Sequence, residues 1–195
     1  MTPTRFAILL SVVLAGCTTK DQSSYLEILR VIPGTFAAPV PPATQGTCSI
    51  SPTDKEVDFL NIDLTKRFGL VGVVVSNNLT SNAVTGINRL NTNNFIAKQA
   101  VISYEVIGGG SGPGQVISPA QGLAPSGATS ALTTFLFPQG ANVSATIPAG
   151  KSVRVSFRIE GKLEDGSSAR TNQFDYVFQT CAPTGAADCS SSQCL

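Results

Sequence analysis

Histidine, the side chain that most often performs proton transfer in catalysis, is absent from this 195-residue chain. Serine and cysteine nucleophiles that depend on a histidine base are therefore excluded. Neither a Gly-x-Ser-x-Gly elbow nor a Ser-x-x-Lys pair occurs, so serine chemistry with another base has no support either. We expect no catalytic residues, no enzymatic activity and no cofactor.

Acidic side chains are the remaining candidates for catalysis, because two Asp or Glu groups brought together by a fold are enough for glycoside hydrolysis. Most of the candidates alternate with apolar residues or flank predicted turns, and such positions are typical of the solvated face of a sheet. We therefore interpret them as surface residues. The candidates are Glu56, Asp58, Asp63, Glu160 and Glu164.

The N-terminus has the layout of a secretion signal. Arg5 precedes an apolar run over residues 6–14, and small residues follow that run. The run has about half of the roughly 20 apolar residues that a helix needs to cross a bilayer. It leads into Leu14-Ala15-Gly16-Cys17, which resembles the lipobox of bacterial lipoproteins.

The resemblance to lipoproteins implies a specific course of processing. Residues 1–16 would be removed as a signal peptide, the thiol of Cys17 would carry a diacylglyceryl group, and the new amino group would be acylated. Two acyl chains give stable attachment to a membrane, where one is marginal. Thr18 rather than aspartate follows Cys17, and by the same resemblance this favours the outer membrane of a bacterial cell envelope.

The balance of basic and acidic side chains indicates which classes of partner to expect. Arg5 is the one charged residue of segment 1–16, so its removal would leave 12 basic and 12 acidic side chains. No run of basic residues exceeds Lys66-Arg67, whereas proteins that bind nucleic acids ordinarily show a basic excess or a basic face. We expect no nucleic acid partner. The expected partners are the membrane, through covalent lipid, and an envelope protein that the sequence does not identify.

Four cysteines follow Cys17, and an even number in an exported chain indicates two disulfides. Three of the four lie in the last 15 residues, so two bridges without leftover thiols require Cys48 to join the C-terminal tail. The chain-entropy model credits so long a loop with about 4 to 5 kcal/mol. We expect no metal site, because a zinc site would ordinarily show Cys-x-x-Cys or His. The disulfide candidates, with three connectivities open, are Cys48, Cys181, Cys189 and Cys194.

A β-hairpin near the C-terminus is the strongest structural prediction. Residues 153–163 alternate apolar and polar side chains with the period of a half-buried strand. The following Asp165-Gly166 is a favoured two-residue hairpin turn. With this turn, partner residues have numbers that sum to 331, which puts an aromatic and aliphatic ladder on one face. The predicted pairs are Phe157 with Phe174, Val155 with Tyr176, and Val153 with Phe178.

Other segments also have strand patterns, and no convincing long amphipathic helix is present. Residues 25–32 fit a strand or two helical turns, of which we favour the strand. Residues 58–64 and 68–76 predict a strand pair connected by 65–67, the second strand being apolar on both faces. Further strands are predicted at 99–107, 132–137 and 143–147. Segment 108–130 is rich in Gly, Pro, Ala and Ser, and it predicts a long irregular loop. Such loops often carry binding surfaces, but we favour a variable loop without a partner, because the segment has few aromatic or Arg anchors.

These patterns predict an all-β fold, a single antiparallel β-sandwich. Residues 147–155 resemble a loop-and-strand phrase of immunoglobulin-like and fibronectin-like sandwiches, which implies an architecture and no particular function. The expected organisation is a signal peptide over 1–16, a lipid-anchored tether with a short strand over 17–47, and a sandwich domain over 48–195 with a disulfide-tied tail.

Two functional hypotheses follow. The first is a lipid-anchored envelope protein whose domain is a structural or protein-interaction module without catalysis. The alternative is a domain that binds carbohydrate or another small ligand through loop carboxylates. The first hypothesis predicts an apolar surface patch, whereas the second predicts a concave site with converging acidic and aromatic side chains.

Overall fold

A computed structural model of the chain describes residues 25–37, 47–50, 60–62, 69–80, 93–110, 112–138 and 143–181. This part is all-β apart from one helical turn, and it holds no helix long and apolar enough to cross a membrane. The elements are β1 (Leu26–Pro33), β2 (Thr35–Ala37), β3 (Thr47–Ser49), β4 (Leu60–Ile62), β5 (Leu70–Asn77), β6 (Phe95–Val106), β7 (Val116–Gln121), β8 (Leu123–Ala124), β9 (Thr129–Phe135), α1 (Val143–Thr146), β10 (Ser152–Leu163), β11 (Ser168–Arg170) and β12 (Phe174–Thr180).

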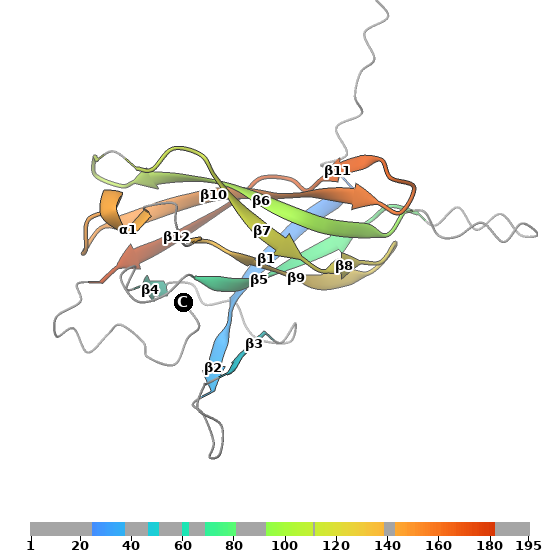
Figure 1. Cartoon of the computed structure of the whole chain (residues 1–195), viewed down its shortest axis with the longest axis horizontal. Helices are drawn as coiled ribbons and strands as arrows, with labels where there is room; N and C mark the ends of the chain where they lie inside the picture. The colour runs from blue at the N-terminus through green and yellow to red at the C-terminus, as the bar shows by residue number, and fades with distance from the viewer. Residues whose placement is uncertain are drawn as a thin grey trace, which may run out of the picture.

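Ten of the strands belong to one curved sheet. Its order is β1-β5-β9-β7-β6-β10-β12-β4, with β11 paired to β10 and β8 paired to β6. All pairs are antiparallel except β12 with β4, and β2 and β3 form a separate pair. Figure 1 shows the sheet curling so that β1, β5 and β9 face β10 and β12 across the core. The described part is therefore nearly barrel-shaped.

Strand β7 turns one corner of this near-barrel. Its first residues pair with β6, whereas Ala120 and Gln121 pair with β9. Gly122 follows with φ of +131°, and a Cβ there would lie 2.8 Å from Cδ2 and 3.2 Å from Cα of Leu132. A residue without a side chain is needed at such a bend. The chain can then rejoin β6 as β8.

Asn172 connects the β1 edge of the curved sheet to the opposite side of the core. It lies in the link between β11 and β12, and its backbone N–H donates to the carbonyl oxygen of Leu26 at 3.0 Å. Its side-chain Oδ1 accepts the backbone N–H of Ile28 at 2.7 Å. One residue thus satisfies two backbone groups on the edge of β1, where a barrel would have a strand ladder.

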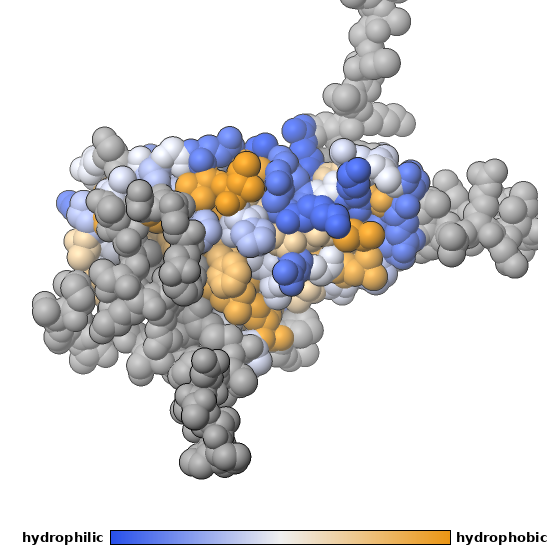
Figure 2. Space-filling model, in the orientation of Figure 1, coloured by the Kyte–Doolittle hydropathy of each residue, from blue (hydrophilic) through white to orange (hydrophobic). Residues whose placement is uncertain are grey.

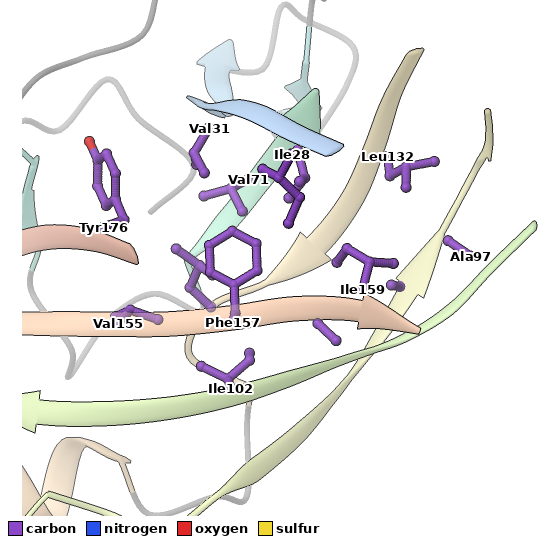
Figure 3. Packing of buried hydrophobic residues seen from close by; sticks show 14 of the residues in the cluster. Ile28, Val31, Val71, Ala97, Ile102, Leu132, Val155, Phe157, Ile159 and Tyr176 are labelled. Carbon is purple, nitrogen blue, oxygen red and sulfur yellow. The ribbon is translucent and has the colours of Figure 1, made fainter. Parts of the chain in front are cut away.

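The core lies between the two sides of the sheet. Phe95, Phe157 and Phe178 are among its largest fully buried side chains. Figure 3 shows Phe157 projecting from β10 toward Val71 and Ile28 on the facing strands. Aromatic rings also contact one another edge to face, with centroids 4.7 Å apart for Phe137 and Phe178. Such pairs add to the stabilisation from buried apolar area.

The predicted register of the C-terminal hairpin is confirmed in the part of the hairpin that is farther from its turn. The three predicted pairs occur with all six side chains buried or packed against the core, and the rings of Phe157 and Phe174 lie 5.9 Å apart. The pairs are Val153 with Phe178, Val155 with Tyr176, and Phe157 with Phe174.

The predicted turn of that hairpin is wrong by one residue. The N–H of Leu163 donates to the carbonyl oxygen of Ser167 at 2.9 Å, which encloses three residues, and the last of them, Gly166, has positive φ. Near the turn, β10 and β11 therefore pair one residue out of the predicted register. After Thr171 the strand pairing is interrupted, and the predicted register returns beyond the interruption. There the Oγ1 of Thr171 accepts the N–H of Ile159. The extra residue in that interruption leaves Asn172 able to reach β1.

The predicted strand at 25–32 is present as β1, whereas the predicted pairing of 58–64 with 68–76 is wrong. Strand β4 runs parallel to β12, and β5 pairs with β1 and β9. As expected for a central strand, β5 is buried on both faces. Val71 and Val73 face the core, and Ile50 covers Gly72 so closely that a Cβ on Gly72 would lie 2.3 Å from it.

Two other predictions need correction. Segment 143–147 contains α1 instead of a strand, because Val143 and Ile147 are both buried four residues apart and Ile147 donates its N–H to the carbonyl of Val143. Segment 108–130 is not an irregular loop, since it contains β7, β8 and the start of β9. Its inward-facing residues include Ser118 and Ala120. Because neither is a large apolar residue, the sequence does not show the alternation of apolar and polar residues that is typical of a strand. The strands predicted at 99–107 and 132–137 are present as β6 and β9.

Candidate interaction surface

The acidic residues do not form a catalytic pair in the described part of the chain. Glu160 lies on the outer face of β10 and is partly exposed, and Glu164 lies in the exposed turn after β10. No group of three Asp, Glu, His or Cys side chains among the described residues could hold a metal ion. The other three candidates, Glu56, Asp58 and Asp63, lie outside the described residues.

Glu160 is held in its ionised form by its neighbours. Partial burial acts to raise its pKa, but hydrogen bonds from Gln99 and Arg158 and the charges of Arg158 and Arg170 outweigh burial, so the pKa is lowered. The contacts are Gln99 Nε2 and Arg158 Nε, each at 2.9 Å. A carboxylate with a lowered pKa is a poor general acid at neutral pH.

The buried polar side chains serve the fold. Asn77 is fully buried, and its Nδ2 donates to the carbonyl oxygens of Asn93 at 2.8 Å and Ala124 at 2.9 Å. Tyr104 donates its hydroxyl to the carbonyl of Leu136, and burial raises the pKa of this phenol. Asn77 connects the end of β5 to β8 and to Asn93, and Tyr104 connects β6 to the residue after β9, so these contacts help to fix the shape of the near-barrel.

Two of the predicted disulfide cysteines, Cys48 and Cys181, belong to the described residues. Cys181 directly follows β12 and is disulfide-bonded, with a partner outside the described side chains. Cys48 lies in β3, where its backbone pairs with Phe36. Thr180 holds the end of β12, since its Oγ1 accepts the N–H of Lys151 at 2.9 Å and donates to the carbonyl of Pro148 at 2.7 Å. Cys17, Cys189 and Cys194 lie outside the described residues.

The strand registers arrange outward side chains in rows across β7, β8, β6, β10 and β11. In the first row Leu123 pairs with Ile96, which pairs with Lys162. In the second row Pro119 pairs with Gln99, Gln99 with Glu160, and Glu160 with Arg170. In the third row Ile117 pairs with Val101, which pairs with Arg158. Directly paired side chains on one face of a sheet contact one another, so the rows form a continuous surface.

Apolar side chains occupy one side of these rows. Ile117 is 63% exposed and Leu123 is 47% exposed, although both belong to regular strands. Pro119 lies between them and is exposed, and Val101 beside Ile117 is nearly buried. Figure 2 shows hydrophobic areas on this face, separated and bordered by hydrophilic ones. Two exposed aliphatic side chains on one face, with exposed Pro119 in the row between them, favour a contact surface more than a single one would.

Basic side chains occupy the other side of the rows. Arg158, Lys162 and Arg170 follow one another along β10 and β11, and Lys98 is exposed nearby at the irregularity of β6. The one carboxylate among them is Glu160. This apolar and basic area is named here the β7–β10 patch, and it consists of Ile96, Lys98, Gln99, Val101, Ile117, Pro119, Leu123, Arg158, Glu160, Lys162 and Arg170.

Beyond the third row, the same face of the sheet carries polar side chains and paired opposite charges in place of apolar and basic ones. Ser103 pairs with Ser156, and Ser156 with Asp175. In the next row Arg154 and Glu105 form an exposed ion pair at 2.9 Å. Such a pair at the surface contributes little stability and leaves no net charge. The β7–β10 patch is thus confined to the half of the face that includes the turn after β10.

The sequence did not predict this patch, because β7 and β8 were missed. The signal available was Val116-Ile117 followed by alternation through Leu123, but Ser118 and Ala120 took the inward positions that an apolar residue usually marks. Pro119 also argued against a strand. Its missing N–H is tolerated here, and its carbonyl accepts the hydroxyl of Thr134 on β9 at 3.0 Å.

No protein-family model matches the chain, and no curated protein or solved structure is significantly similar to it.

Proposed function

We propose that the chain is a lipid-anchored cell-envelope protein whose β domain is a non-catalytic structural or protein-interaction module. The segment Leu14-Ala15-Gly16-Cys17 supports the anchor, with Cys17 as the lipidated residue and residues 1–16 as its signal peptide. The outer membrane is the proposed location, because Thr18 follows Cys17.

The β7–β10 patch is the observation that supports the proposed role as an interaction module. Ile117 and Leu123 are held on regular strands, so their exposure does not depend on a loop changing shape. Rigid apolar side chains beside basic ones lose little conformational entropy when they dock. We therefore assign docking to this face of the sheet.

The finer fold assignment belongs to the same proposal. Within the near-barrel, β1, β5 and β9 form one side and β6, β10 and β12 the other, with β7 paired to both. This arrangement supports a sandwich related to the immunoglobulin-like class. The ligand-binding alternative gains no comparable support, since Glu160 is occupied by Gln99 and Arg158, and Glu164 lies in an exposed turn.

Intact-mass measurement of the protein from its native membrane tests the anchor. The expected result is cleavage before Cys17 with added acyl chains, and a Cys17→Ala variant that lacks both. An unmodified mass for the wild-type protein would overturn the anchor and the location with it.

Site-specific photo-cross-linking in intact envelopes tests the docking role. A cross-linker at position 117 should form adducts with an envelope component, whether lipid or protein. The matched control is position 107, because Ile107 is 41% exposed and lies at the opposite end of β6 from the first row. Equal adducts at both positions, or none at 117, would count against the patch.

A further inference from the structure

We propose that the β7–β10 patch lies against the anionic phospholipid surface of the membrane that holds the anchor. The proposal rests on the proposed function, because it uses the lipidated Cys17 as the point of attachment. Its occupant is a lipid surface and not an acidic protein. The choice follows from the place where the tether meets the fold and from the chemistry of the patch.

The part of the expected tether that precedes the first described residue, residues 17–24, leads into the fold beside the patch. The first described residue, Tyr25, accepts the N–H of Asn78 on its carbonyl at 2.7 Å, and the adjacent Asn77 donates to the carbonyl of Ala124. Ala124 is the neighbour of Leu123 in the first row. On the basic side, Asn172 bonds to Leu26 at 3.0 Å, two residues after Arg170. The start of β1 is thus close to both margins of the patch.

The tether is too short to carry the domain far from the membrane. Seven residues lie between Cys17 and Tyr25, and covalent geometry limits the span of the eight Cα-to-Cα steps to about 28 Å. A lipid on Cys17 therefore keeps this end of the domain within roughly one domain diameter of the headgroups. The membrane is the surface that the patch meets at the highest local concentration, whichever proteins are present.

The chemistry of the patch is that of an interfacial surface. Ile117 and Leu123 supply exposed aliphatic groups that can enter the headgroup region, as on membrane-surface helices. The four basic side chains Lys98, Arg158, Lys162 and Arg170 outnumber Glu160 of the patch even when Glu164 and Asp165 of the adjoining exposed turn are included, four against three. Each basic side chain near an anionic membrane strengthens binding roughly fivefold. The rows beyond the patch carry the paired charges of Arg154 and Glu105 and the carboxylate of Asp175, which have no such attraction.

The test uses the chain from residue 17 onward with Cys17→Ser, so that binding is measured without the anchor. Its partition onto vesicles of equimolar phosphatidylglycerol and phosphatidylcholine is compared with partition onto phosphatidylcholine alone. We expect binding to the anionic vesicles that weakens as salt is added, since salt screens exposed charges. Lys162→Ala should weaken it roughly fivefold and Leu123→Ser about tenfold.

Two variants at the far end of the domain are the matched controls. Ile107→Ser removes an aliphatic side chain of similar exposure, and Lys151→Ala removes an exposed lysine. Both should bind anionic vesicles as the parent does. Equal partition onto neutral and anionic vesicles, or equal losses in patch and control variants, would overturn the membrane assignment.

The cross-linking and mass measurements separate this proposal from the proposed function. If vesicles are not bound but position 117 cross-links to an envelope protein, the patch is a protein interface, and the membrane assignment alone fails. If the native protein carries no acyl chains, the anchor fails whatever the vesicles show. Salt-sensitive anionic binding that is lost in the patch variants, with acyl chains on Cys17, supports both.

Discussion

Gly161 shows how closely β6 and β10 approach one another at the irregularity of their pairing. A Cβ on Gly161 would lie 2.1 Å from the carbonyl oxygen of Ile96 and 2.9 Å from the ring of Phe95. The backbone of β6 cannot yield without breaking the ladder. We therefore expect Gly161→Ala to lower the free energy of unfolding by about 2 kcal/mol or more, measured by urea denaturation.

Gly114 provides the control for that substitution, because a Cβ there would meet nothing within 4 Å. Gly114→Ala should change the free energy of unfolding by no more than about 0.5 kcal/mol. If both substitutions are neutral, the close approach of Gly161 to Ile96 does not exist in solution.

Glu160 makes a pH-dependent contribution to stability. Although partial burial opposes ionisation, hydrogen bonds from Gln99 and Arg158 and the nearby Arg charges lower its pKa below the unfolded value. The stabilisation is therefore fully present above the unfolded pKa of about 4.3 and is lost as pH falls through the folded pKa. Glu160→Gln should flatten this part of the acid destabilisation in a series of melting temperatures against pH. Parallel curves for the two proteins would contradict the assignment.

Among the elements, the seam between β1 and the β11–β12 link depends on Asn172. Removing its side chain leaves the N–H of Ile28 without its acceptor. We expect Asn172→Ala to cost about 1 to 3 kcal/mol and to speed hydrogen exchange at Ile28 more than at Val73 in the centre of the sheet.

The neighbouring Gln173 supplies the control for the seam. Its side chain is exposed and reaches Asp175 at 3.4 Å, so Gln173→Ala should leave both stability and exchange at Ile28 nearly unchanged. Equal exchange at Ile28 in the Asn172→Ala variant and the parent would show that the seam is held by other contacts.

The sequence predicted elements where periodicity and composition agreed. Alternation along β10 and the aromatic residues of β12 gave the outer register, because a slip would have moved a whole ladder to the other face. The observed turn differs from the predicted one by one residue, since Asp-Gly suits a three-residue loop with Gly166 at positive φ as well as a two-residue turn. Nothing local could reveal the compensating break at Thr171.

Other elements depended on partners distant in the chain. The parallel pairing of β4 with β12 joins residues more than 100 positions apart, and no local pattern specifies it. Segment 143–147 has β-branched residues, yet burial of Val143 and Ile147 on one side favours a helical turn. The candidate surface could not be predicted for a related reason. Its residues come from β6, β7, β8, β10 and β11, and only the pairing registers of these strands bring them together.

At the scale of the whole molecule, the two ends of the near-barrel differ in what they offer. One end combines the entry of the tether with the first row of the β7–β10 patch. The other end carries the exposed Ile107, the glycines that follow it and the turn before β10, and Figure 1 shows this turn near α1, away from β8 and β11. If the patch rests on the membrane, the second end faces outward and is available to protein partners.

A disulfide from Cys48 to the C-terminal tail would close the longest loop of the chain and so stabilise the whole fold. Cys181 is disulfide-bonded at the end of β12, and with three candidate cysteines in the tail, two bridges require Cys48 in β3 to join one of them. That bond should contribute about 4 kcal/mol to the free energy of unfolding. We therefore expect Cys48→Ala to lower it by about that amount in urea denaturation, and reduction of this variant to have a smaller effect than reduction of the parent. Non-reducing peptide mapping should find Cys48 linked to a cysteine of the tail, and a free thiol at Cys48 would leave the fold stabilised by its sheet and by short tail loops alone.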